Sequence, residues 1–77
     1  MRVVWASEVE RRLRSFPTSD EAAIRGAVQR FASGSDVDPA EGSLMRRLRV
    51  VGHVVLMVLD PDGRTVRVVR LFRAERR

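Results

Sequence analysis

The feature that most constrains the fold is an uninterrupted apolar run, Val54-Val55-Leu56-Met57-Val58-Leu59, in a chain of 77 residues. A run of this length, bounded by turn residues, is typical of a strand that is covered on both faces. The next residues, Asp60-Pro61-Asp62-Gly63, predict a hairpin turn, because proline presets one backbone angle and glycine accepts a left-handed conformation. Residues 65–72 then form the returning strand.

Further strands are predicted on the N-terminal side of this run. Residues 44–51 alternate in part between apolar and arginine residues, and Gly52-His53 predicts a turn between them and the run. Residues 2–5 form a short β-prone opening. The chain therefore supplies a small sheet around residues 54–59.

A first helix is predicted over residues 7–15. Ser7 stands three residues before Glu10, the spacing of a capping box, in which each side chain satisfies a free amide of the first helical turn. Pro17 disfavours helical geometry for the residue before it and ends the helix. The apolar stripe of this helix consists of Val9, Leu13 and Phe16.

A second helix is predicted over residues 18–33, where Thr18 and Glu21 repeat the capping-box spacing and Gly34 stops the pattern. Its apolar stripe consists of Ile24, Ala27, Val28 and Phe31. Residues 34–43 are polar and aperiodic, which predicts a loop. The order β-α-α-β-β-β predicts an α+β domain over residues 1–77, a helical hairpin packed on a small antiparallel sheet. The predicted core places both helical stripes against Val55, Met57 and Val68.

The charge is concentrated in the C-terminal half. The chain has 15 basic residues, all arginine, against 10 acids, a net charge of +5. Residues 1–43 carry −1 and residues 44–77 carry +6. A field of one sign on half of a small domain favours a polyanion or an acidic protein as partner. The absence of cysteine excludes disulfides and thiolate metal sites, and no apolar run approaches the length of a membrane span. No signal peptide is recognisable, so the cytoplasm is expected.

Two kinds of side chain are candidates for chemistry. Arg47 and Arg49 alternate with apolar residues and are expected on one exposed face, either merely solvated or chelating phosphate. His53, the only histidine, is either a turn residue or a general acid or base beside these arginines. Trp5 is expected in the core rather than stacked on a base, and Glu8, Glu10 and Glu21 are expected to complement helix dipoles.

Two segments, RVVWASEVERRLRSFP and LMRRLRVVGHVVLMVLDPDGRTVRVVRLF, resemble the RelE/ParE superfamily of toxins from type II toxin–antitoxin modules. The resemblance runs nearly end to end and implies the same fold. Ribonuclease members cleave mRNA in the ribosomal A site by driving the 2′-hydroxyl onto the adjacent phosphate. Arg47 and Arg49 match the basic strand of the family, and Arg73 falls near basic residues after its last strand. The sequence departs from the family at Val54, where an arginine is usual, and in having no tyrosine.

The resemblance leaves the target open. One hypothesis is a ribosome-dependent endoribonuclease that inhibits translation, with His53, Arg47 and Arg49 as catalytic residues. Its expected RNA-binding residues are Arg46, Arg47, Arg49, Arg70 and Arg73. The alternatives are a ParE-type inhibitor that binds DNA gyrase without catalysis, or a decayed toxin that binds only its antitoxin. The resemblance also implies an acidic cognate antitoxin as partner; no metal, cofactor or membrane is expected.

Overall fold

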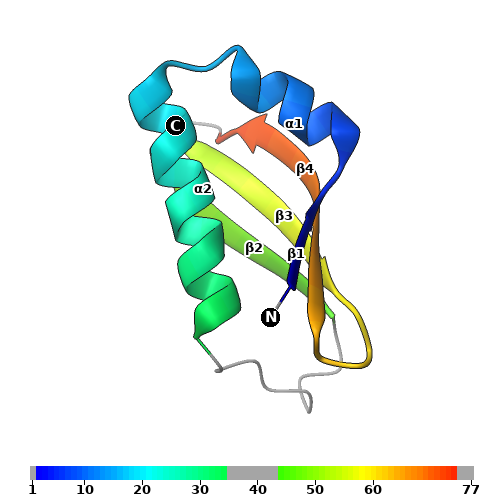
Figure 1. The fold of residues 1–77 in the computed structure, drawn as a ribbon. Coiled ribbons are helices and arrows are strands. Elements are labelled where there is room, and N and C mark those ends of the chain that lie inside the picture. The colour runs from blue at the N-terminus through cyan, green and yellow to red at the C-terminus, as the bar shows by residue number, and fades with distance from the viewer. Residues whose placement is uncertain (1, 35–43, 75–77) are drawn as a thin grey trace.

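The computed structural model describes residues 2–34 and 44–74. The elements follow in the order β1 (Arg2–Trp5), α1 (Ser7–Arg14), α2 (Thr18–Ser33), β2 (Met45–Val50), β3 (His53–Leu59) and β4 (Thr65–Arg73), as Figure 1 shows. This β-α-α-β-β-β order confirms the predicted α+β class. The predicted loop over residues 34–43 lies outside the described residues except for Gly34, which caps the end of α2.

The sheet has the strand order β1-β4-β3-β2. The apolar run forms β3, which pairs antiparallel with β2 on one side and with β4 on the other. The opening strand β1 pairs parallel with β4, so the sheet is mixed rather than wholly antiparallel. After β1 the chain forms the two helices and then returns to the sheet at its opposite edge, as β2. The strand propensity of residues 2–5 does not indicate the direction in which they pair with a strand so distant in the sequence.

Two tight turns connect the last three strands. In the turn from Asp60 to Gly63, the Gly63 amide donates to the Asp60 carbonyl oxygen at 2.9 Å and Gly63 has a φ of +71°, which confirms the predicted hairpin. The other turn is formed by Val51 and Gly52, with φ angles of +43° and +81°. His53 therefore begins β3 and is not a turn residue. A left-handed conformation is unfavourable for a β-branched side chain, so Val51 holds local strain of about 1–3 kcal/mol.

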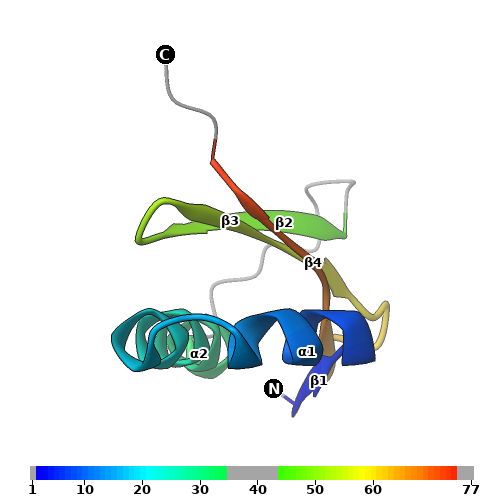
Figure 2. The ribbon, with the colours of Figure 1, turned by 90° about the horizontal axis from the view of Figure 1, so that it is seen from above.

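Both helices cover one face of the sheet, and no other described element covers the opposite face (Figure 2). The core between these layers contains Val9, Leu13, Ile24, Val28, Ala32, Val55, Met57, Leu59, Val66, Val68 and Leu71. Most of the predicted helical stripes thus meet the predicted strand residues, with Phe16 and Phe31 partly buried at the margin. The exception is Ala27, which is not part of this core; Ala32 belongs to it instead. No helix in the described part of the chain is long and apolar enough to span a membrane.

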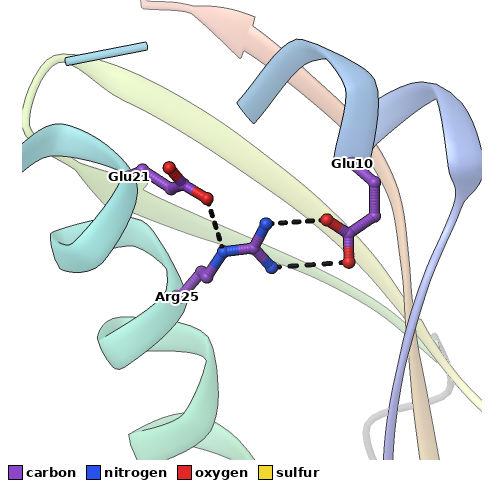
Figure 3. A network of polar contacts seen from close by, with 3 residues as sticks. All are labelled: Glu10, Glu21 and Arg25. Atoms are coloured by element: carbon purple, nitrogen blue, oxygen red, sulfur yellow. Dashed lines mark hydrogen bonds and ion pairs between the residues drawn. The ribbon is translucent and has the colours of Figure 1, made fainter. Parts of the chain in front are cut away.

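A polar cluster ties the two helices together and replaces the predicted capping boxes (Figure 3). The N-cap residues are Ala6 and Pro17, and neither makes a side-chain cap. Arg25 instead donates to Glu10 Oε1 at 2.7 Å and to Glu21 Oε2 at 3.0 Å.

The same guanidinium also holds β1 against the helices. It lies over the ring of Trp5 at 5.1 Å from the ring centroid, within the range of a cation–π contact. Trp5 packs against the core, as the sequence predicted. Arg25 therefore joins α1, α2 and β1.

We expect Glu10→Gln to weaken the dependence of stability on pH. The hydrogen bond from Arg25 holds the pKa of Glu10 below its ordinary value of 4.5. This contribution to stability is therefore full above pH 4.5 and is lost as pH falls through the lower pKa of the folded state. Because the two side chains are each 31% exposed, the effect is about 1 kcal/mol or less. Urea unfolding at neutral and acid pH measures it.

The matched control is Glu8→Gln, which removes an acid from the same first turn of α1. Glu8 is exposed and makes none of the contacts to Arg25. This control should keep the pH slope of the parent protein. Equal slopes for Glu10→Gln and the parent would show that the pair does not stabilise the folded state.

Candidate functional site

The uncovered face of the sheet carries a set of arginines. In β2, exposed Arg47 and Arg49 alternate with half-buried Leu48 and Val50, so the two arginines share the uncovered face as predicted. Strand pairing sets Arg47 opposite Leu56, and Leu56 in turn opposite Arg70 of β4. The central strand therefore presents an apolar row with arginines on both sides.

Val54 occupies the next position of this row. It lies between Arg49 of β2 and Phe72 of β4 in the strand pairing. It is 6% exposed but is not part of the core beneath the helices. An apolar residue thus fills the centre of the uncovered face, where the resembling family usually has an arginine.

Arg46 lies apart from the other candidate arginines. Its neighbour in the strand pairing is Met57, a core residue, and it is half-buried. Its Nη1 donates to the Met45 carbonyl oxygen at 2.9 Å. The alternation of β2 directs it to the helix side, away from Arg47 and Arg49.

An open hollow of about 760 Å³ lies at the end of the sheet beside the Val51-Gly52 turn. Its walls are formed by Asp20, Arg49, Val51, Gly52, His53, Arg73 and Ala74. Of the residues expected to act in catalysis, Arg49 and His53 line this hollow, together with Arg73. Arg49 belongs to the uncovered face of the sheet, whereas His53 contacts Phe16 on the helix side, so the hollow spans the end of the sheet. Arg47 does not line the hollow, because the strand pairing places it farther along β2, opposite Leu56.

The position of His53 is fixed by contacts on two sides. Its ring lies 4.7 Å from the ring of Phe16, between centroids. Its Nδ1 is 3.2 Å from the Val51 carbonyl oxygen, which can only accept a hydrogen bond. A proton on Nδ1 satisfies this contact, so Nε2 is the nitrogen available to a ligand, as acceptor or, in the imidazolium, as donor.

Asp20 is the residue of the hollow that the sequence did not indicate. It is half-buried in the first turn of α2, which brings it from the helical layer to a hollow otherwise built by strands and their turn. Its carboxylate makes no ion pair or hydrogen bond with a described side chain. Only the packing of α2 against the sheet brings it near His53, so no motif or spacing could have revealed it.

The chemistry available to the hollow is anion binding with proton transfer. Arg49 and Arg73 supply permanent positive charge, while His53 and Asp20 can each exchange a proton. The described residues contain no group of three His, Cys, Asp or Glu side chains that could hold a metal ion.

Comparisons with models of protein families, with curated proteins and with solved structures gave no match. The resemblance to RelE/ParE toxins therefore rests on the two segments quoted above.

Proposed function

We propose that this chain is a RelE/ParE-like toxin of a type II toxin–antitoxin module that acts in the cytoplasm and inhibits translation by cleaving ribosome-bound mRNA. The observation that carries the proposal is that Arg49, Arg73 and His53 line one hollow. The hollow adjoins the uncovered sheet face, on which Arg47 and Arg70 flank an apolar row.

The proposed reaction needs positive charge at the phosphate and groups that move protons. Attack of a ribose 2′-oxygen on the adjacent phosphorus gathers negative charge on the phosphoryl oxygens, which guanidinium groups can bind in pairs. Arg49 and Arg73 take this role, and His53 transfers a proton through Nε2. Arg47 and Arg70 bind the flanking phosphates of the strand along the sheet.

We expect Arg49→Ala and Arg73→Ala each to slow cleavage about 10- to 100-fold, because each removes a charged hydrogen bond worth about 1.5–3 kcal/mol. Both side chains are exposed and make no ion pair with described residues, so the fold should persist. Arg11→Ala is the control, since Arg11 is an exposed arginine of α1 that lies outside the hollow. Cleavage rates on ribosome-bound mRNA measure the effect; equal losses in all three variants would indicate a role of net charge alone.

The proposed antitoxin is an acidic protein that binds the face of the sheet that the helices leave uncovered. Exposed apolar residues lie among the arginines there: Met45 is 53% and Phe72 is 41% exposed. A partner with acidic and apolar side chains would match both kinds of surface. Coexpression with an acidic protein from a neighbouring gene, followed by size-exclusion chromatography, tests this pairing, and a chain that stays monomeric and non-toxic with every neighbouring gene product would contradict it.

A second candidate function is inhibition of DNA gyrase by binding. It is favoured by Val54, which puts a buried apolar side chain where a catalytic arginine is usual in ribonuclease members of the family. Pulse labelling after induction separates the two functions. A ribonuclease stops incorporation of amino acids first, whereas a gyrase inhibitor stops DNA synthesis and induces the DNA damage response.

A further inference from the structure

We propose that Asp20 is a catalytic residue of this reaction, the base that removes the proton from the attacking 2′-hydroxyl, with His53 as the acid that protonates the leaving oxygen. The inference rests on the proposed function and adds to it a residue from the helical layer. The resemblance to toxins does not indicate Asp20, and only the hollow itself does.

The first argument is the number of groups that can exchange a proton. Cleavage by a 2′-oxygen removes one proton from the nucleophile and adds one to the leaving group. It is therefore fastest when one side chain acts as the base that takes the first proton and another as the acid that gives the second. Two arginines line the hollow, and they stay protonated. Asp20 and His53 are the groups left among the described wall residues that can act as the pair.

The second argument is the space between the charges. Asp20 comes from α2, while Arg49, His53 and Arg73 come from β2, β3 and β4. The carboxylate makes no ion pair, within 4.0 Å, with either arginine, although all of them line the same hollow. The hollow of about 760 Å³ is large enough for a phosphate and its ribose.

The third argument is charge balance. With His53 as the imidazolium that its role as acid requires, the two arginines, the imidazolium and one carboxylate give the hollow a net charge of +2. A phosphodiester carries a single negative charge, so the hollow attracts it and can also stabilise the further negative charge that gathers on the phosphoryl oxygens as the 2′-oxygen attacks. No acid other than Asp20 lines the hollow among the described residues.

The contacts of His53 decide which of its two nitrogens acts, and the proposal gives that nitrogen the role of acid. Its Nδ1 faces the Val51 carbonyl oxygen at 3.2 Å, which favours a proton on Nδ1 and leaves Nε2 to carry the transferable proton of the imidazolium. A carboxylate opposite an imidazolium is the complementary base. The charged groups that face this pair are Arg49 and Arg73, and both stay cationic throughout.

The step conserves atoms and charge. The 2′-oxygen forms a bond to phosphorus as its proton passes to the Asp20 carboxylate, and the bond from phosphorus to the 5′-oxygen breaks as that oxygen takes a proton from His53. The products are a 2′,3′-cyclic phosphate and a 5′-hydroxyl. Proton exchange with water then returns Asp20 to the carboxylate and His53 to the imidazolium.

A structural role for Asp20 predicts different behaviour. An acid in the first turn of a helix stabilises it by about 0.3–1 kcal/mol through the helix dipole. Glu8 also lies in the first turn of its helix, α1, but outside the hollow, so Glu8→Gln reproduces the loss of a first-turn acid without touching the site.

The test is the rate of cleavage of ribosome-bound mRNA by full-length Asp20→Asn, Asp20→Glu and Glu8→Gln as a function of pH. We expect Asp20→Asn to be about 10²- to 10⁴-fold slower, with Asp20→Glu partly restored and Glu8→Gln unchanged. In the wild type the Asp20 carboxylate supplies the base, so the rate should not depend on the hydroxide concentration. In Asp20→Asn hydroxide replaces this base, so the rate should rise with pH.

Two results separate this inference from the function on which it rests. A rate and pH profile of Asp20→Asn equal to wild type would overturn the role of Asp20 and leave the ribonuclease intact. An equal fall in Asp20→Asn and Glu8→Gln, with the wild-type profile retained, would show a structural role and overturn it as well. Absence of cleavage by the wild type would contradict the proposed function itself.

Discussion

Leu13→Ala is expected to leave the chain largely unfolded at room temperature. Leu13 is fully buried in α1 at the centre of the core. Removing its side chain should cost about 2–5 kcal/mol, through lost burial and an unfilled cavity. A domain of this size, without disulfides, lies near the lower end of the 5–15 kcal/mol that is roughly typical of folded proteins. Circular dichroism during thermal unfolding measures the loss.

Leu44→Ala is the matched control, since it makes the same chemical change at a leucine that is 39% exposed. It should shift the melting temperature little. A Leu13→Ala variant that melts like the parent protein would contradict the docking of α1 on the sheet.

The second large effect is expected for His53→Gln, which should slow cleavage of ribosome-bound mRNA about 10²- to 10⁴-fold, because glutamine cannot transfer a proton near neutral pH. The ring contact with Phe16 is also lost, at a cost to stability of about 0.5–1.5 kcal/mol. Melting curves of the variant show whether it remains folded under the assay conditions. A folded His53→Gln with wild-type rate would exclude proton transfer by His53, and would leave its ring as a structural contact of Phe16.

Local patterns predicted most of the fold. The apolar run became the central strand, and the Asp60 to Gly63 turn formed because Pro61 and Gly63 suit its geometry. Both helices bury their predicted apolar stripes, except for Ala27, because helical periodicity indicates which face of a helix is buried.

The predictions that were wrong are the two capping boxes and the antiparallel pairing of β1. In both cases contacts between residues far apart in the sequence prevail over local preferences. Glu10 and Glu21 have the spacing of capping boxes, but the guanidinium of Arg25 in α2 binds both carboxylates instead. The direction of β1 depends on where the chain returns after two helices, and residues 2–5 carry no information about that.

The candidate site was predicted only in part, for the same reason. Alternation placed Arg47 and Arg49 on one face, which the pattern of β2 confirms. The meeting of Arg49, His53 and Arg73 depends on strand register, and the approach of Asp20 depends on helix packing. Neither is encoded in spacing along the chain.

The most direct test of the central claim is the mapping of transcript ends on translating ribosomes after induction of wild type and His53→Gln. If the hollow cleaves ribosome-bound mRNA, new 5′-hydroxyl ends appear with wild type and are nearly absent with His53→Gln. If wild type produces no new ends while growth still stops, the ribonuclease account is wrong, and Arg49, Arg73 and His53 belong to a binding surface.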